Sequence, residues 1–436
     1  MRSHSTDHGK LGASWSSRAA AAATMGLLLL CASTEVCAQG IIFTAAGPVN
    51  RSMGGASTAA PIDATGALYW NPASISGMAQ SETSVSLDLL FPVHSIESTL
   101  GGFTGSTDAD AGAFPVPNVG VVQHTKIDGV TFGAGVTTLG GFGTNVPADP
   151  TNPILTAPPG GLGQISSSGL FLQIVPVLSV ALTEQFSVAA GPTITTGRIS
   201  LEPFVFDSAN ADGTYSTGNA SRYHWGSGFQ VGAFYILDEQ WRLGASFKSP
   251  VWMEKFEFNG LDENGLPRKL TTDLDLPLIL SLGTSYQANE QTLLALDARL
   301  IDYGGAEGFG DDPVYDATGA LQGLGYSSVF ALAAGIQHHV GELLTVRGGY
   351  TYNQNPISNA ESFFNMGSPV IYEHMFSGGA SLNFSESFSA NLAYSYYLEN
   401  DRTGPIVLPG IGAVPGSSLT NELSAHIFSF GFTMRK

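Results

Sequence analysis

Charged side chains are scarce in this sequence. Asp, Glu, Lys and Arg make up only 12% of the 436 residues, whereas roughly 25% is usual for a soluble domain. The shortage argues against the two or three ordinary soluble domains that the length alone would suggest. Acidic residues outnumber basic ones and the formal net charge is -19, so nucleic acid is not expected as a partner.

Cysteine is also nearly absent, because the chain contains only Cys31 and Cys37. Both lie in an N-terminal stretch in which basic residues precede the apolar run 19–32 and the small-residue sequence 36–38. This order is typical of a secretory signal peptide, so we predict that residues 1–38 are removed on export. The mature chain then has no disulfide, and we expect hydrogen bonding and packing alone to stabilise it.

Long hydrophobic runs are missing after residue 38. No apolar stretch there approaches the roughly 20 residues that a membrane-spanning helix needs. If the exported chain crosses a membrane, it must therefore cross as β-strands, which need only about 10 residues each.

What the chain has instead is a series of segments in which apolar and polar residues alternate. We predict fourteen strands, at 81–91, 117–126, 129–139, 168–182, 185–199, 226–237, 240–258, 274–287, 291–303, 327–339, 343–353, 373–384, 387–398 and 423–434. Tight turns such as 127–129 and 183–185 alternate with much longer loops such as 140–167. An even strand number with short turns on one side and long loops on the other is typical of an all-β transmembrane antiparallel barrel.

The alternation also predicts which side chains face the barrel interior. Within 343–353, Leu344 and Val346 share one face, while Thr345 and Arg347 share the other. We expect the apolar face to contact lipid and the polar face to line the lumen.

The stretch before the first strand has a different pattern. Residues 53–78 are rich in Ala and Gly, contain two prolines and show no two-residue alternation. A barrel of this size would leave an aqueous channel unless something filled it. We therefore predict an N-terminal hatch, residues 39–80, in the lumen of a barrel formed by residues 81–436.

Two motifs resemble those of a known family. The first combines Met53-Gly-Gly-Ala-Ser57 with Tyr69-Trp-Asn-Pro-Ala73, and the second is Arg347-Gly-Gly-Tyr-Thr-Tyr-Asn-Gln-Asn-Pro-Ile357 followed by His374. The chain thereby resembles the FadL/TodX family of outer-membrane transporters for long-chain fatty acids and aromatic hydrocarbons. The resemblance implies passive transport across the outer membrane of a Gram-negative bacterium, with capture by external loops, hatch-gated passage and lateral release.

The hatch motif supplies the candidate gating residues, Asn71, Pro72 and Ala73. From the residues alone, Asn-Pro-Ala is an ordinary turn that initiates at Asn71 and needs no gating role. The resemblance implies instead that these three residues belong to the gate.

A fatty-acid site needs an apolar slot and a cation or strong donors for the carboxylate. Lumen-facing cations well inside predicted strands are Lys248, Arg299 and Arg347, and these are the candidate ligand-binding residues. Asp297 shares a face with Arg299, so neutralisation of that arginine is an alternative. A ladder of lumen charges that only solvates the interior is an alternative for each cation.

Glycines cluster in the third predicted strand. Gly133, Gly135, Gly140 and Gly141 weaken ladder pairing and tolerate a bulge or kink. We predict that the wall opens sideways here. The alternative is that small residues merely make room for the hatch.

Apolar side chains in the long loops suit the capture of a hydrophobic substrate. They are Phe103, Phe142, Leu155, Leu162, Phe204, Phe206, Phe309, Phe363 and Phe364. Packing of the loops into a lid is the alternative explanation.

Two other functions compete with transport of hydrophobic compounds. Ser424 and His426 lie two apart on one strand face, which is the minimum for a lipid hydrolase, but no nucleophile elbow is present. A general diffusion pore is the other, and the predicted hatch argues against it.

No enzymatic activity, catalytic residue, metal or cofactor is predicted. The expected partners are a hydrophobic small molecule, outer-membrane lipid and lipopolysaccharide, and the barrel insertion machinery. We expect a monomer, because a closed barrel has no free edge.

Overall fold

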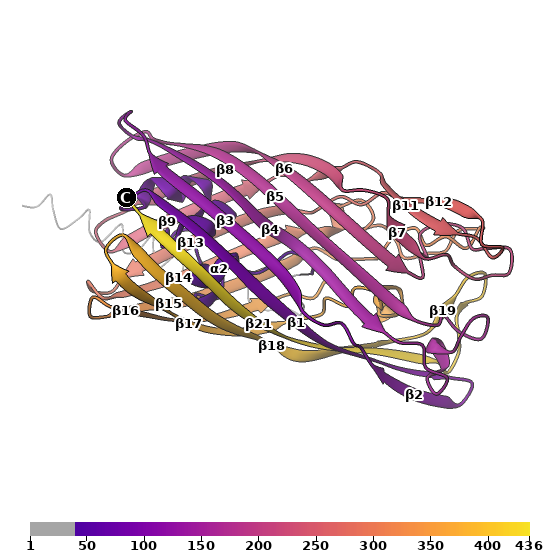
Figure 1. Cartoon of the computed structure of the whole chain (residues 1–436). Helices are drawn as coiled ribbons and strands as arrows, with labels where there is room; N and C mark the ends of the chain where they lie inside the picture. The colour runs from indigo at the N-terminus through magenta and orange to yellow at the C-terminus, as the bar shows by residue number, and fades with distance from the viewer. Residues whose placement is uncertain (1–39) are drawn as a thin grey trace, which may run out of the picture.

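The computed structural model describes residues 40–436 (Figure 1). The predicted signal peptide, residues 1–38, lies outside the described residues. Within the described part of the chain, no helix is long and apolar enough to cross a membrane.

Fourteen long antiparallel strands within residues 40–436 form a closed barrel. They are β1 (Glu82–Leu100), β3 (Phe114–His124), β4 (Val130–Val146), β5 (Ile165–Ala181), β6 (Phe186–Glu202), β8 (His224–Ile236), β9 (Trp241–Lys248), β13 (Leu278–Gln287), β14 (Thr292–Asp302), β15 (Val329–Val340), β16 (Leu344–Asn353), β17 (His374–Ser385), β18 (Phe388–Gly404) and β21 (Ser418–Arg435). Each pairs with the next along the chain, and β21 pairs back with β1 from Glu82 opposite Arg435 to Thr99 opposite Ser418. Closure satisfies the backbone groups at the seam, which lipid could not do.

Short strands and 3-10 helices occupy the long connections. They are β2 (Phe103–Asp108), η2 (Pro153–Leu155), β7 (Gly218–Ala220), β10 (Trp252–Met253), β11 (Phe256–Leu261), β12 (Pro267–Thr272), η3 (Tyr303–Gly305), η4 (Asn359–Glu361), η5 (Phe363–Asn365), β19 (Val407–Leu408) and β20 (Gly412–Ala413). The long loops gather at the end of the barrel opposite to the C-terminus (Figure 1). The two ends are called the long-loop end and the short-turn end below.

The predicted number of strands is confirmed, but one predicted strand is wrong in its extent. The segment 240–258 does not form one strand, because β9 ends at Lys248, two residues before Pro250. A proline has no amide hydrogen to donate to a ladder. Residues 256–261 instead form β11, which pairs with β12 in a separate hairpin at the long-loop end.

Side-chain alternation follows the prediction. On β17, Phe376 and Phe384 are exposed on the outer surface, while Ser381 is buried in the lumen. On β16, Thr345 and Thr351 are likewise buried. The outer surface is therefore apolar and the lumen polar, as the membrane environment requires.

The hatch lies inside the barrel and consists of α2 (Gly47–Ser52), α3 (Ala64–Trp70) and η1 (Pro72–Gly77) (Figure 1). Local sequence explains its helices. Pro48 occupies the first turn of α2, where a missing amide hydrogen costs nothing. Asp63 caps α3 by accepting a hydrogen bond from Gly66 N, and Asn71 ends α3 and caps η1.

Candidate functional site

Asn71 joins the hatch to the barrel wall. Its side chain is completely buried, and Nδ2 donates to Thr58 O at 2.8 Å within the hatch and to Ala233 O at 3.0 Å on β8. Its Oδ1 accepts a hydrogen bond from Ala73 N at 3.1 Å. This approach requires Gly232 on the wall, since a Cβ there would lie 2.2 Å from Asn71 Oδ1.

The rest of the motif extends the same attachment. Pro72 begins η1, and Ala73 O accepts a hydrogen bond from Ser179 Oγ on β5 at 3.3 Å. The predicted triad therefore connects the hatch to two separate wall strands. Its role as a gate remains a prediction.

Arg299 also contacts the hatch. Its Nη2 donates to Gly55 O at 2.6 Å and lies 2.7 Å from Asp297 Oδ2, while the guanidinium carbon lies 3.5 Å from the centre of the Trp70 ring. Asp297 Oδ2 in turn accepts hydrogen bonds from the backbone of the hatch at residues 57 and 58. The pairing of Arg299 with Asp297 could be predicted from their spacing on one strand face. The hydrogen bonds from the hatch amides of residues 57 and 58 to Asp297 could not.

Lys248 and Arg347 lie in different places. The Nζ of Lys248 is 4.6 Å from the centre of the Tyr69 ring, on the same side of the lumen as Arg299. Arg347 lines a polar cavity of about 840 Å³ at the short-turn end, where it donates to Gln337 Oε1 and Ser381 Oγ, both at 2.7 Å. The structure thus does not bring the three predicted cations together, and their role in ligand binding remains a prediction.

A second buried ion pair was not predicted. Arg51 Nη2 on α2 lies 2.7 Å from Asp88 Oδ2 on β1 and 2.9 Å from Ala45 O. Burial alone would lower the pKa of Arg51, but the adjacent Asp88 carboxylate raises it above its ordinary value. Arg51 is the single basic residue of the predicted hatch, which marks it as a candidate for a buried ion pair but does not identify Asp88 as its partner.

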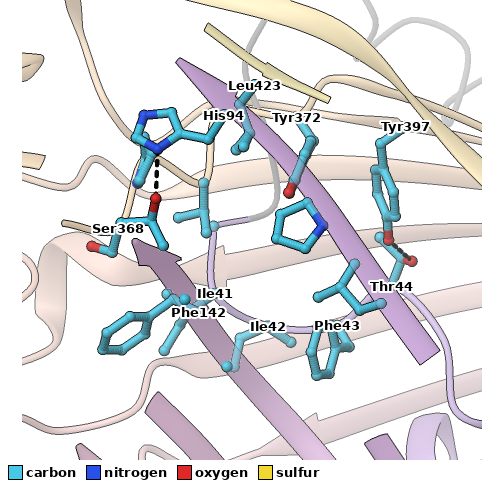
Figure 2. Close-up of a pocket in the computed structure, with 18 of the residues that line it drawn as sticks. Ile41, Ile42, Phe43, Thr44, His94, Phe142, Ser368, Tyr372, Tyr397 and Leu423 are labelled. Carbon is cyan, nitrogen blue, oxygen red and sulfur yellow. Dashed lines mark hydrogen bonds between the residues drawn. The ribbon is translucent and has the colours of Figure 1, made fainter. Parts of the chain in front are cut away.

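An apolar cavity lies between the N-terminal segment 40–44 and the long-loop end of the lumen. Figure 2 shows Ile41, Ile42 and Phe43 on one side, with His94, Tyr372 and Leu423 across from them. The cavity volume is about 50 Å³, well below the roughly 150 Å³ of a cavity known to bind benzene. A ring-sized ligand therefore requires the segment 40–44 or the loop opposite to move.

Three phenols hold this N-terminal segment. Ile42 N donates to Tyr303 Oη at 3.0 Å, and Thr44 Oγ1 lies 2.6 Å from Tyr397 Oη. Tyr69 Oη lies 2.8 Å from both Phe43 O and Leu139 O. Side-chain hydrogen bonds thus attach the segment to β18, to η3 in a long connection and to α3 of the hatch.

The barrel wall is interrupted beside the same segment. Pairing between β3 and β4 stops at Asn118 opposite Thr137, although β4 continues to Val146. Pro115 and Pro117 lie at the end of β3 that pairs with β1 but not with β4, and they lack amide hydrogens. In place of β3, the segment 41–43 pairs with this part of β4 through Phe43 N to Leu139 O and Gly141 N to Ile41 O, both 3.0 Å.

The predicted glycines divide between two situations. Gly140 and Gly141 lie at the interruption, next to a register shift after Thr138. Gly133 and Gly135 lie within the fully paired stretch, and a Cβ on Gly133 would be 2.6 Å from Leu68 of the hatch. A Cβ on Gly140 would also lie 2.5 Å from Ile41 O of the N-terminal segment. Room for the hatch thus accounts for Gly133 and Gly140 alike, and the lateral opening remains a prediction.

The loops form a partial lid with a third cavity, about 100 Å³ in volume, beneath it. Six of the predicted loop side chains line it: Phe142, Leu162, Phe206, Phe309, Phe363 and Phe364. Leu155 and Phe204 are buried within the loops, whereas Phe103 is 75% exposed. Both predicted uses of these residues, capture and lid packing, are thus compatible with their positions.

The serine and histidine of the hydrolase alternative lie on the outer face of β21. His426 Nδ1 is 2.8 Å from Tyr394 Oη on the neighbouring strand, and Phe428 beside it is exposed. This environment faces lipid and presents no cavity around Ser424 among the described cavities.

A closed barrel with an internal hatch and an apolar cavity above it defines a channel protein of the outer membrane. A family model described as "Outer membrane protein transport protein (OMPP1/FadL/TodX)" matches residues 29–435. The chain belongs to this family and is an outer-membrane transport protein, not an enzyme.

Solved structures share the fold. The toluene transporter TodX of Pseudomonas putida is 18% identical over 92% of this chain and 99% of its own, with a TM-score of 0.65. A FadL homologue of Pseudomonas aeruginosa is 17% identical over 91% and 99%, with a TM-score of 0.70. The toluene transporter TbuX of Ralstonia pickettii is 17% identical over 90% and 98%, with a TM-score of 0.65. No curated protein sequence matches the chain.

Proposed function

We propose that the protein is a passive channel for hydrophobic compounds, either long-chain fatty acids or related hydrocarbons. The substrate is captured beneath the long loops, passes into the apolar cavity above the hatch, and leaves sideways between β3 and β4 into the membrane. The described part of the hatch, residues 40–80, closes the periplasmic end of the barrel formed by residues 81–436.

The observation that carries this proposal is that three spaces adjoin one another and share lining residues. Phe142 lines the loop cavity, the apolar cavity and a groove of about 400 Å³ at the interruption of the wall. Phe43, Leu90 and Gly141 line both the apolar cavity and this groove. Movement of Phe142 and of the segment 40–44 would therefore join these spaces into an apolar path from the loops to the outer surface.

The outer surface and the closed wall support the remaining partners. An apolar outer face suits contact with outer-membrane lipid, including lipopolysaccharide, and a barrel of this kind requires the insertion machinery for assembly. The seam between β1 and β21 leaves no unpaired edge at that position, which supports a monomer.

The test crosslinks the N-terminal segment across the exit. Phe43→Cys with Leu139→Cys places two thiols on adjacent positions of the segment and β4, in a mature chain that has no other cysteine. We expect oxidation to stop the uptake of labelled toluene or oleate by cells that lack their own transporter, and reduction to restore it.

The control pair is Val121→Cys with Ala134→Cys, which joins β3 to β4 where they are already paired. Oxidation of this pair should leave uptake unchanged. Equal uptake by the oxidised and reduced forms of the first pair would rule out lateral exit at this site. A large, steady conductance of the unmodified protein in a planar bilayer would favour the diffusion pore instead.

A further inference from the structure

The apolar cavity contains a polar side chain that has no partner. Asn353, the last residue of β16, lines the cavity and is completely buried. Within residues 40–436, neither its Nδ2 nor its Oδ1 has a hydrogen-bond partner, although its backbone N donates to Glu373 O at 2.8 Å. A buried amide left unpaired is destabilising because its lost hydration is not replaced, so this position is costly unless a bound molecule completes it.

The same cavity contains no full charge. Its lining residues include no Asp, Glu, Lys or Arg. The ring nitrogens of His94 lie 2.7 Å from Thr144 Oγ1 and 3.3 Å from Asn421 Oδ1, both of which are neutral groups. A carboxylate placed here would lose its hydration without gaining a cation, which is strongly unfavourable.

The approach to the cavity is also unfavourable for anions. The loop cavity is lined by Glu202 and Asp273 and by no Lys or Arg. Of the candidate cations, Arg299 is paired with Asp297, and Arg347 lies at the opposite end of the lumen. None of Lys248, Arg299 and Arg347 lines either cavity.

We propose that the cavity selects an uncharged hydrophobic molecule that carries one neutral hydrogen-bonding group, a hydroxyl or a carbonyl, and that Asn353 determines this preference. The inference rests on the proposed function and narrows its substrate class. A ligand hydroxyl both donates and accepts, so it can pair with Oδ1 and Nδ2 of one amide. The hydroxyl of Tyr372 lies on the same cavity and offers a second neutral partner.

The experiment compares three ligands built on one ring: toluene, benzyl alcohol and benzoate. Binding to the purified protein in detergent micelles is measured by equilibrium dialysis, with empty micelles as the blank. One added hydrogen bond is worth about 0.5–1.5 kcal/mol, so we expect benzyl alcohol to bind about three- to tenfold more tightly than toluene. Benzoate should bind most weakly.

Asn353→Leu removes both polar atoms at similar volume. We expect it to weaken the binding of benzyl alcohol and to strengthen that of toluene, so that the order of the two reverses. Tyr372→Phe removes one hydroxyl and should weaken only the alcohol, with little risk to folding. The matched control is Asn383→Leu, a lumenal asparagine at the short-turn end, which should leave the order unchanged.

Each outcome separates the inference from the proposed function. Equal or tighter binding of benzoate, or an equal loss for all three ligands in Asn353→Leu, overturns the inference and leaves transport intact. Failure of the native protein to bind any of the three ligands or to promote their uptake overturns the proposed function as well.

Discussion

Asp63 caps a helix of the hatch, but burial disfavours its charged form. It caps α3 through a hydrogen bond from Gly66 N at 3.1 Å, yet it is buried in the hatch. Burial, with a smaller contribution from the Glu82 carboxylate, raises the pKa of Asp63 from 3.8 to about 6. The folded protein therefore holds this proton more tightly than the unfolded chain does.

The free energy of unfolding therefore depends on pH through Asp63. Because the folded pKa is the higher one, the stabilisation by protonation is complete below about pH 4 and is lost as the pH rises to about 6. We expect the free energy of unfolding in urea to fall by at most about 3 kcal/mol across that range. Asp63→Asn keeps a capping oxygen and cannot ionise, so its stability should lack this component. Asp128→Asn, in the exposed turn after β3, should keep the full slope.

The sequence allowed some residue roles to be predicted and not others. Asn71 was identified by its motif, and the Arg299–Asp297 pair by spacing on one strand face. The pairing of Arg51 with Asp88 joins positions 37 residues apart in two different elements, so no local pattern indicates it. The unpaired state of Asn353 depends on what surrounds it in three dimensions, and no sequence pattern encodes that.

At the scale of elements, the strands were predictable because alternation is a local property. The predicted strand 81–91 matches the first half of β1, which begins at Glu82, extends to Leu100 and continues through a turn into β2. Alternation weakens beyond the membrane, where both faces meet water or loops, so strand ends at the long-loop end could not be found. The prediction of an interruption rested on the glycine-rich stretch of β4. Pro115 and Pro117 in β3, which lack amide hydrogens, were the stronger signal of it.

Pro115 and Pro117 allow the interruption between β3 and β4 to be tested. Pro115→Val with Pro117→Val restores two amide hydrogens at the end of β3, so we expect β3 to compete with the segment 41–43 for the edge of β4. Uptake of labelled toluene should then fall severalfold, and the exchange of the β4 amides at 139–141 should change in hydrogen-exchange measurements. Uptake equal to that of the native chain would show that the interruption has another cause. Pro250→Val, outside the exit, is the control.

For the whole molecule, the decisive arrangement is that two buried ion pairs contact the hatch from different strands of the barrel. The first joins the hatch to the wall, whereas the second lies within β14 and bonds to the hatch backbone at residues 55, 57 and 58. Arg51 pairs with Asp88 on β1, and Arg299 pairs with Asp297 on β14, at 2.7 Å in both cases. Removing one partner of a buried pair costs about 3–5 kcal/mol because the other charge is left unpaired. Either pair alone still leaves the hatch attached through Asn71 and the opposite pair.

We therefore expect the double variant Arg51→Met with Arg299→Met to release the hatch while each single variant retains it. In planar bilayers the native protein and both single variants should conduct little, and the double variant should show steady ion conductance, because a barrel of this size without its hatch leaves an aqueous channel. Arg242→Met, a lumenal change on β9 away from both ion pairs, is the control and should remain closed. Heat-dependent electrophoretic mobility checks that each barrel is folded. A double variant that stays closed would show that packing and Asn71 suffice to hold the hatch.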